Sequence, residues 1–392
     1  MNKIVIASDS FKGSLSSAEV ADAASAGIKD VCPSCEVIRL RTGDGGEGTC
    51  EAIAETLACD WVQVQTADPL GRAISAKYAR TRTVHPTAII ELAQASGLTL
   101  LRESERDPMK TSTFGTGLMI MDAADKGCRN FIIGLGGSAT NDGGTGMMEA
   151  LGFRFLDKEG NTISGCCGEK LVMISDIDSS AVPQSILSSS FTVACDVDTV
   201  FYGKAGATYI FAPQKGAGRK IIEDLEEGMK SFSKVIRKKY GIDLNEIKGS
   251  GAAGGAGGAL HSLLNTRLSK GADLVLDTAG FEEIIEGADL IVTGEGKIDS
   301  QSICGKLPFT VLRRASAKGI PVAAIGGLID LDEKEIKDSG FFSILPIQPR
   351  PADADSLAAA MSSSTASRNI RQTMAGFIRS MMNGCNNGLI SR

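Results

Sequence analysis

The glycine-rich stretch from Phe131 to Met147 limits the fold of this chain more than any other part of its sequence. An apolar run, Phe131–Ile133, predicts a buried strand, and six of the fourteen residues that begin at Gly134 are glycines. Helix-forming residues resume at Met147. A strand that leads through a glycine-rich turn into a helix points backbone N–H groups at an anion. The stretch therefore predicts either a phosphate loop of an α/β fold or a tight structural turn.

Length and charge narrow the class of protein. A chain of 392 residues is too long for one compact core, so two domains are expected. The net charge of −6 argues against a general nucleic-acid binder. No apolar run approaches the ~20 residues of a membrane span, and MNKIVIAS at the start predicts a strand rather than a signal peptide. We therefore expect a cytoplasmic protein whose phosphate site is built from lysines, backbone amides and a divalent cation.

Cysteine and histidine usage points to carboxylate and lysine chemistry. The ten cysteines are expected to be free thiols, including Cys32 and Cys35, because no second CxxC completes a zinc site. Only His85 and His261 are present, which excludes a multi-histidine metal centre. Aspartate, glutamate and lysine side chains are then left to carry any reaction.

The first loop of the chain is one candidate for ligand binding. The strand Lys3–Ala7 is followed by a polar segment that offers Asp9, Ser10 and Lys12. Open α/β sheets bind ligands at the carboxyl ends of their strands. We therefore expect Ser10 and Lys12 to contact a phosphate or carboxylate group. The alternative for Lys12 is an ordinary solvated lysine on the surface.

A second signal is internal to the sequence. The pattern T-x-D-G-G-x-G occurs at 42–48 and again at 140–146, each time after a strand and before a helix. Two loops of like geometry would each present one aspartate, Asp44 or Asp142, and magnesium is bound by such carboxylates together with phosphate. Chance similarity in a chain with 46 glycines is the alternative.

Further candidates follow other strands and turns. Asp196 ends the strand Phe191–Ala194, while Glu295 and Asp299 follow the strand 289–292. Arg72 closes the turn that begins at Asp68 and offers either a fork to a substrate carboxylate or a salt bridge at the rim. The segment GSGAAGGAGG at 249–258 predicts a flexible linker, close packing, or a nucleotide lying across Gly254 and Gly255.

The distribution of these signals predicts the domain organisation. Both ends of the chain have a βαβ texture, whereas short alternating β-rich runs begin at Trp61. We predict an α/β protein with a discontinuous domain, 1–66 plus 272–392, built on a parallel-type sheet. Residues 67–271 form an inserted α/β domain that carries the glycine-rich phosphate loop. Ligands are expected in the cleft between the two domains.

Two other functions are compatible with some of these signals. A dinucleotide-binding oxidoreductase would use Gly134–Ala139 as G-x-G-x-x-A and Asp157 as the acid after the next strand. Its helix would then have to run through Thr140–Gly144, which are poor helix formers. A binding protein without chemistry would need fewer carboxylates beside an anion site. Phosphoryl transfer without a P-loop explains more of the glycine-rich loops, lysines and strand-end acids.

Taken together, the motifs resemble the type 1 glycerate kinases over essentially the whole chain. In order they read SDSFKGSLSS, GDGGEGT, DPLGR, ELAQASGL, FGTG, GLGGSATNDGGTGM, CDV, PQKGAG, GAAGG, GEGKIDSQ, GK at 305–306 and TASRN. The resemblance implies ATP-dependent phosphorylation of D-glycerate to 2-phosphoglycerate with Mg²⁺ in the cytoplasm, by two α/β domains with the active site between them. Formation of 3-phosphoglycerate is the alternative. The expected partners are small molecules, with no nucleic acid or membrane, and the sequence leaves open whether the chain forms a homo-oligomer.

Residue roles within such a kinase are our own physical hypothesis. The cofactor-binding residues are expected to be Gly136, Gly137, Ser138, Thr140, Gly254, Gly255 and Glu295, and the metal ligand Asp44 or Asp142. Substrate is expected to bind to Ser10, Arg72 and Lys306. In catalysis, Lys12 and Lys215 would stabilise charge on the transferred group, and Asp196 or Asp299 would accept the proton.

Overall fold

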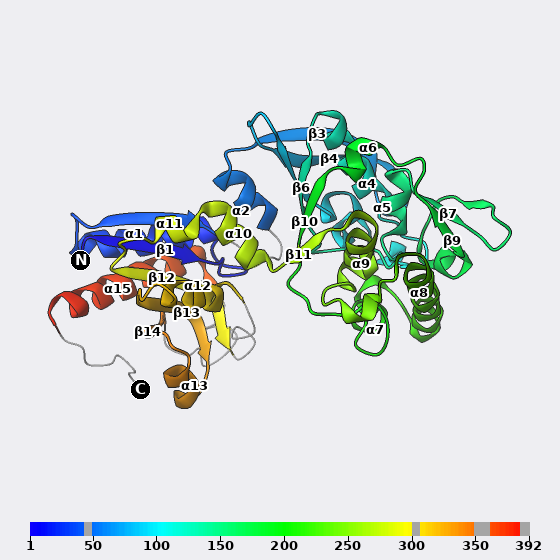
Figure 1. The fold of residues 1–392 in the computed structure, drawn as a ribbon. Coiled ribbons are helices and arrows are strands. Elements are labelled where there is room, and N and C mark those ends of the chain that lie inside the picture. The colour runs from blue at the N-terminus through cyan, green and yellow to red at the C-terminus, as the bar shows by residue number, and fades with distance from the viewer. Residues whose placement is uncertain (43–48, 300–305, 349–360, 385–392) are drawn as a thin grey trace. The chain divides into compact units, whose positions relative to one another are not determined.

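The structure is a computed structural model, and it describes residues 1–42, 49–299, 306–348 and 361–384. It has two compact units: a discontinuous unit, Met1–Asp44 with Ala272–Arg392, and an inserted unit, Gly45–Gly271 (Figure 1). The predicted α/β class is confirmed. The first division falls ahead of the predicted 66–67 boundary, because α2 (Thr49–Thr56) and β3 (Asp60–Ala67) contact strands of the inserted unit.

The discontinuous unit is built on a parallel five-stranded sheet in the order β14-β13-β12-β1-β2. Its strands are β1 (Lys3–Ser8), β2 (Glu36–Arg41), β12 (Leu290–Asp299), β13 (Val322–Asp330) and β14 (Ser343–Pro346). β1 is an interior strand and is almost wholly buried, as expected of a parallel strand covered on both faces. Its Ile4 pairs with Leu290 on one side and Val37 on the other.

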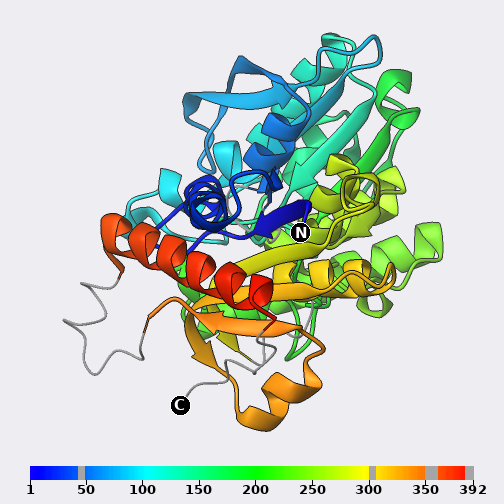
Figure 2. The same cartoon turned by 90° about the vertical axis from the view of Figure 1, so that its left-hand side faces the viewer.

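Helices cover both faces of this sheet. They are α1 (Ser17–Val31), α10 (Gly271–Ala279), α11 (Phe281–Ile284), α12 (Leu307–Ser316), α13 (Glu333–Asp338) and α15 (Ser363–Met382). Ile4 and Ile6 pack on α1 and α15, whereas Val5 and Ala7 pack on the face covered by α10, α11 and α12, since side chains alternate along a strand. α15, drawn in red in Figure 2, lies against α1.

The inserted unit contains a six-stranded sheet in the order β11-β10-β6-β5-β4-β3. Its strands are β3, β4 (Ala73–Arg80), β5 (Thr87–Glu91), β6 (Asn130–Gly134), β10 (Ser190–Ala194) and β11 (Arg267–Ser269). β3, β4 and β5 are antiparallel, and β5, β6, β10 and β11 are parallel. A small antiparallel sheet is formed by β7 (Arg154–Leu156), β8 (Thr162–Ile163) and β9 (Asp176–Asp178). The carboxyl ends of four parallel strands thus lie along one edge.

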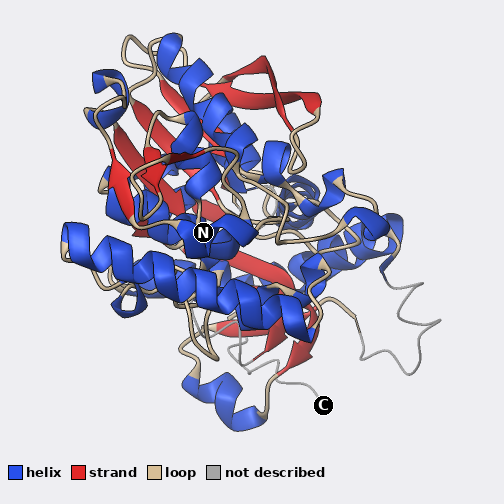
Figure 3. Ribbon diagram, turned by 90° about the vertical axis from the view of Figure 1, so that its right-hand side faces the viewer, coloured by secondary structure: helices blue, strands red, loops and turns tan. Residues whose placement is uncertain are grey.

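The helices of this unit surround both sheets. Besides α2 they are α3 (Ala93–Ser96), α4 (Phe114–Asp125), α5 (Thr145–Ala150), α6 (Gln184–Leu187), α7 (Ala207–Phe211), α8 (Arg219–Tyr240) and α9 (Ala252–Leu264), with short 3₁₀ turns at 98–100, 103–105, 168–173, 213–215 and 244–246. The long helix nearest the viewer in Figure 3 is α8, whose Phe232 packs between Phe155 and Phe201. Its last turn carries basic residues and ends at Gly241, in the left-handed conformation that favours glycine.

Two expectations from composition concern these described ranges. Each of the eight cysteines within them is a free thiol, in agreement with the prediction. None of the helices that they form combines the length and apolar content needed to cross a membrane.

Candidate active site

The sheet of the discontinuous unit has its switch point between β1 and β12. From β1 the chain continues to β2 on one side, whereas β12 is followed by β13 and β14 on the other. Loops diverge at such a point and leave a crevice at the carboxyl ends of the strands, where open α/β sheets bind ligands. The predicted loop after β1 and the predicted acids of β12 therefore meet at the edge where chemistry is expected.

The loop after β1 is tied to β12 and folded back on itself. The Asp9 N–H donates to the Gly294 carbonyl at 2.9 Å, and the Asp9 carboxylate accepts the Ser10 N–H at 2.7 Å. Phe11 and Leu15 exchange backbone hydrogen bonds of 2.8 and 3.0 Å across a turn at Gly13, whose φ of +77° favours glycine. Asp9 is only 5% exposed, so a carboxylate is held at the edge of the sheet in a fixed position.

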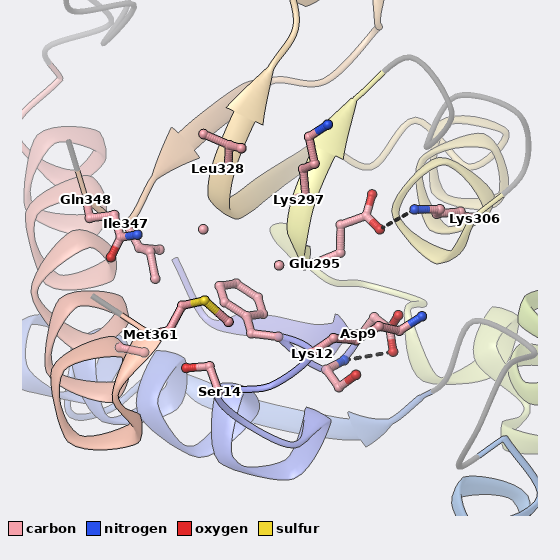
Figure 4. A pocket seen from close by; sticks show the side chains of 15 residues that line it. Asp9, Lys12, Ser14, Glu295, Lys297, Lys306, Leu328, Ile347, Gln348 and Met361 are labelled. Atoms are coloured by element: carbon pink, nitrogen blue, oxygen red, sulfur yellow. Dashed lines mark hydrogen bonds and ion pairs between the residues drawn. The ribbon is translucent and has the colours of Figure 1, made fainter. Parts of the chain in front are cut away.

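A pocket of about 300 Å³ opens at this edge (Figure 4). It is lined by Asp9, Ser10, Phe11, Lys12, Ser14, Glu295, Gly296, Lys297, Lys306, Gly327, Leu328, Ile347, Gln348, Met361 and Ala366. In Figure 4 Lys306 and Lys12 lie toward one side, and Leu328, Ile347 and Met361 lie toward the other. The pocket therefore has a charged half and an apolar half.

The charged half is organised by ion pairs along β12. The Lys306 ammonium lies 3.4 Å from a carboxylate oxygen of Glu295, whose side chain is only 6% exposed. Lys297 lies 3.1 Å from Asp299 and 3.0 Å from Asp330. Buried carboxylates are retained where they are paired, and here the paired lysines remain accessible to a ligand. The ammonium groups of Lys306 and Lys297 are thus positioned by these carboxylates before an anion binds in the pocket.

In the inserted unit, Asp142 holds the glycine-rich loop together. It is fully buried, and its carboxylate accepts the N–H and hydroxyl of Thr113 at 2.8 and 2.7 Å, the Gly144 N–H at 3.1 Å and the Gly146 N–H at 3.2 Å. Burial raises the pKa of Asp142, against the opposing effect of these donors. Both carboxylate oxygens thus accept hydrogen bonds from protein donors, and these bonds order the loop around Asp142.

Lys215 lies beneath the same loop. It is 1% exposed, and its ammonium donates to the Ser138 hydroxyl at 2.9 Å and to the Thr140 carbonyl at 2.6 Å. Burial lowers the pKa of Lys215 to about 7, and the charge of Asp142 acts in the opposite direction. In this position the lysine supports the loop from within, whereas the sequence-based hypothesis gave it direct contact with the transferred group.

The two glycine-rich segments of the inserted unit pack on each other. The Gly143 N–H donates to the Gly254 carbonyl at 2.9 Å, and a Cβ at Gly254 would lie 2.0 Å from the Thr140 carbonyl oxygen. Ala253, Gly254 and Gly255 all have positive φ at the start of α9. Close packing, one of the three interpretations of 249–258, is therefore present in the structure.

The other side of the loop contacts α3 and the 3₁₀ turn at 98–100. Gly137 is exposed, with its carbonyl accepting the Leu98 N–H at 2.9 Å, and Ser138 and Thr140 are buried. The Ala139 N–H donates to the Ser96 carbonyl at 2.8 Å, so this amide is occupied. Gly136 and Gly137 remain the positions at which a ligand could approach the backbone.

The oxidoreductase alternative does not fit this geometry. Residues 140–144 do not form a helix, and α5 is only six residues long. β7, the next strand, belongs to the small sheet and does not lie beside β6, so β6, α5 and β7 do not form a parallel βαβ unit. Asp157 lies in a turn in which its carboxylate accepts the N–H groups of Glu159 and Asn161.

The other predicted residues have different surroundings. Asp196 is exposed at the end of β10, where its carboxylate accepts the Gly271 N–H at 2.8 Å. Arg72 forms ion pairs with Asp68 and Glu105, which is the salt-bridge alternative for this residue. Asp44 lies outside the described residues. Among those residues no group of three or more His, Cys, Asp and Glu side chains is placed to hold a metal ion.

Comparison with known proteins decides the family. The model of the glycerate kinase family matches residues 4–382. The chain belongs to the glycerate kinase family. This confirms the resemblance found in the sequence and the expectation of an enzyme.

Similar proteins extend over nearly the whole chain. A glycerate 2-kinase of Escherichia coli is 40% identical over 379 residues, which are 95% of this chain and 98% of the relative. A glycerate kinase of Halalkalibacterium halodurans is 40% identical over 355 residues, 91% and 93% of the two chains. A crystal structure from Salmonella typhimurium, described as a candidate glycerate kinase 2, superposes with a TM-score of 0.85 at 38% identity and covers 98% of this chain and 99% of its own.

Within this glycerate kinase family member, sequence reasoning missed several residues of the pocket. Leu328, Ile347 and Met361 come from three separate segments, and in the sequence each is an apolar residue like those of the core. Glu91 of the inserted unit, which does not line this pocket, was not predicted either: it ends β5 beside Gly134 and accepts the Cys50 N–H at 3.1 Å. A strand that ends in an acid was the available signal for Glu91, the same signal that singled out Asp196.

Proposed function

We propose that this protein transfers the γ-phosphoryl group of ATP to D-glycerate and forms 2-phosphoglycerate, with Mg²⁺. Membership of the glycerate kinase family and the name of the Escherichia coli relative support the reaction and its product. The single observation that carries the proposal is the pocket at the sheet switch point, where Lys12 and Lys306 accompany the buried carboxylates of Asp9 and Glu295. Cations for the phosphates and acids for a divalent ion are the parts that phosphoryl transfer uses.

The reaction forms a bond between the glycerate hydroxyl oxygen and the γ-phosphorus, and it breaks the bond from that phosphorus to the β-phosphate oxygen. The hydroxyl proton passes to a carboxylate, and Asp196 and Asp299 are our candidates for this acceptor. Lys12 and Lys306 stabilise the negative charge on the phosphoryl oxygens and leaving group. Because phosphoryl transfer needs little covalent help, fixed positions of these groups supply most of the rate gain.

The pocket fits a magnesium site of the kind that phosphate completes. Mg²⁺ is usually held by one or two carboxylates plus waters and substrate phosphates, so a cluster of three protein acids is not required. Asp9 and Glu295 would hold the ion, because both are buried and the Asp9 N–H bonds to Gly294, the neighbour of Glu295. When bound, Mg²⁺ neutralises charge on the phosphate oxygens. We propose these two residues in place of Asp142.

The inserted unit supplies the remaining parts of the proposal. We assign the carboxyl edge of its sheet, with Gly136, Gly137 and Asp196, to the second substrate group, and Lys215 to the positioning of Ser138 and Thr140. We further propose that catalysis requires both units, that the protein acts in the cytoplasm, where ATP is held, and that its partners are small molecules. Light scattering on the protein as it leaves a size-exclusion column measures its molar mass and so tests whether it forms a homo-oligomer.

One assay tests the proposed reaction. The full chain is incubated with ATP, MgCl₂ and D-glycerate, and the product is identified by ³¹P NMR. A signal of 2-phosphoglycerate is expected, and 3-phosphoglycerate would favour the other hydroxyl. Turnover of NADH without ATP would instead indicate an oxidoreductase, and calorimetric binding without turnover would indicate a binding protein. L-glycerate in a parallel reaction measures stereospecificity.

A further inference from the structure

The apolar half of the pocket has no role in the proposed reaction as it stands. Phe11, Leu328, Ile347, Met361 and Ala366 line it, and Phe11 is 3% exposed. D-glycerate carries a carboxylate and two hydroxyl groups and has no apolar surface to bury. A ligand that fills both halves must combine a flat or apolar part with an anionic part, as a nucleotide does.

We infer that the pocket of the discontinuous unit binds the nucleotide, with the adenine base in the apolar half and the phosphates toward Lys12 and Lys306. The inference rests on the proposed function and adds to it where ATP lies and how its base is recognised. It replaces the sequence-based expectation that the nucleotide lies on Gly136–Thr140 and Gly254. The inserted unit is then left for glycerate.

The walls of the apolar half suit a planar ring. Gly296 and Gly327 line the pocket with backbone only, and Leu328 pairs with Lys297 in the ladder between β12 and β13. On the other side, a Cβ at Gly296 would lie 3.3 Å from the Phe11 Cα, so the loop after β1 approaches the strand closely. Aromatic rings gain much of their binding energy from apolar surface buried in such narrow spaces.

Met361 connects the pocket to the start of α15. A Cβ at Gly13 would lie 3.3 Å from the terminal methyl group of Met361. The Ser363 hydroxyl also donates to the Ser14 carbonyl at 2.7 Å, so the loop after β1 is held against α15. Methionine adapts its shape to flat ligands because its thioether is polarizable and unbranched. These contacts fix the width of the apolar half from the side opposite β12.

Gln348 gives the pocket a polar group for the edge of the base. Its side-chain oxygen is buried and accepts no hydrogen bond in the part of the chain that the structure describes. A buried acceptor without a donor is costly, and a ligand that supplies the donor recovers that cost. Adenine presents an exocyclic amino group as donor at the position where guanine presents a carbonyl acceptor. With its oxygen toward the 6-position of the purine, Gln348 would accept from the amino group of adenine and oppose the carbonyl of guanine, so we expect a preference for ATP over GTP.

Substitution of Leu328 tests the position of the base. Calorimetry with ATP and MgCl₂ in the absence of glycerate, on the full chain, is expected to show affinity lowered about tenfold in Leu328→Ala and more in Leu328→Arg. The Michaelis constant for glycerate is expected to stay within about twofold of the wild-type value. Leu187→Arg is the matched control, because Leu187 is 47% exposed in the inserted unit, and no change in ATP affinity is expected.

Gln348→Met tests the recognition of the base independently. It removes the acceptor at similar side-chain length, so the ratio of kcat/KM for ATP to that for GTP is expected to fall about tenfold. Wild-type ATP affinity in folded Leu328→Ala and an unchanged ratio in Gln348→Met would overturn the inference. A raised Michaelis constant for glycerate alone would also overturn it, because glycerate would then occupy the pocket. The proposed function fails separately, if wild-type protein binds ATP and phosphorylates no glycerate.

Discussion

The ammonium nitrogen of Lys215 lies 2.6 Å from the carbonyl oxygen of Thr140, inside the loop that the sequence marks most strongly. Both residues are buried, and the Ser138 hydroxyl is the second acceptor at 2.9 Å. A lysine in such a place is held close to the balance between its charged and neutral forms. The loop therefore depends on a titratable side chain of the protein as well as on its glycines.

The first prediction concerns pH and Lys215. Its pKa of about 7, lowered by burial, is below the ordinary value of 10.5, so between these values the unfolded chain binds a proton that the folded chain does not. Stability must then rise with pH in this window, by up to about 1.4 kcal/mol per pH unit, and the contribution is constant below pH 7. Melting temperatures measured between about pH 6 and 9 should favour wild type over Lys215→Met increasingly above pH 7.

An exposed lysine provides the control for that measurement. Lys204→Met removes a charge from the surface of the same unit and should differ from wild type by the same amount at every pH. A constant difference between wild type and Lys215→Met would show that Lys215 keeps its proton throughout.

The second prediction separates a loop-ordering role of Asp142 from a metal-binding role. Asp142→Asn places an NH₂ group among the donors of Thr113, Gly144 and Gly146, and at least one hydrogen bond is lost. We expect the free energy of unfolding to fall by about 2–3 kcal/mol, seen as a lower melting temperature. The Mg²⁺ requirement of the remaining activity should be unchanged. Asp224→Asn, on the exposed face of α8, should leave both quantities as in wild type. A changed Mg²⁺ requirement with wild-type stability would restore the metal-binding role.

The third prediction concerns charge stabilisation by Lys12. Lys12 is exposed at the pocket, so Lys12→Met should leave the fold intact and lower kcat about 100- to 1000-fold, because a cation beside the developing charge is lost. Steady-state kinetics with ATP and glycerate measure this loss. Lys204→Met is again the matched control and should retain full kcat. A kcat for Lys12→Met within about twofold of wild type would remove this lysine from the reaction.

The sequence predicted those parts of the site that depend on local pattern. Asp9 and Lys12 follow the end of β1, and such an end can be read from a few neighbouring residues. Glu295 and Asp299 were expected after a strand at 289–292, but β12 continues to Asp299, so both acids lie within the strand. Other contacts of the site residues join separate segments of the chain. Lys306, at the start of α12, pairs with Glu295 of β12, and Thr113 donates to Asp142 from 29 residues away. No periodicity in one segment encodes such pairs.

The same limit explains what was missed or placed differently. Leu328 and Met361 line a pocket, yet in the sequence each is an apolar residue like those of the core. Gly254 was read as a position for a ligand because glycine serves close approach to a ligand and close approach to the chain equally well. Only the position of the Thr140 carbonyl distinguishes the two uses.

The fourth prediction tests the proposed role of Glu295. Glu295→Gln keeps the shape of a side chain that is 6% exposed and removes its charge, so Lys306 loses its partner and a divalent ion loses a ligand. The Mg²⁺ concentration that gives half-maximal activity should rise about tenfold or more. Glu283→Gln, exposed on α11, should leave it unchanged. A lower kcat with the Mg²⁺ dependence of wild type would limit Glu295 to holding Lys306.

The fifth prediction addresses the packing of the two glycine-rich segments. Gly254→Ala adds a Cβ 2.0 Å from the Thr140 carbonyl oxygen at a residue whose φ is +65°, so both strain and overlap oppose it. We expect a loss of about 3 kcal/mol in stability, seen as a melting temperature lower by about 10 °C. Gly376→Ala lies in an open, exposed position of α15, and the same substitution should there stabilise by about 0.5–1 kcal/mol. If Gly254→Ala melted like wild type but bound ATP poorly, the glycine would serve the nucleotide, and the nucleotide would lie on the inserted unit after all.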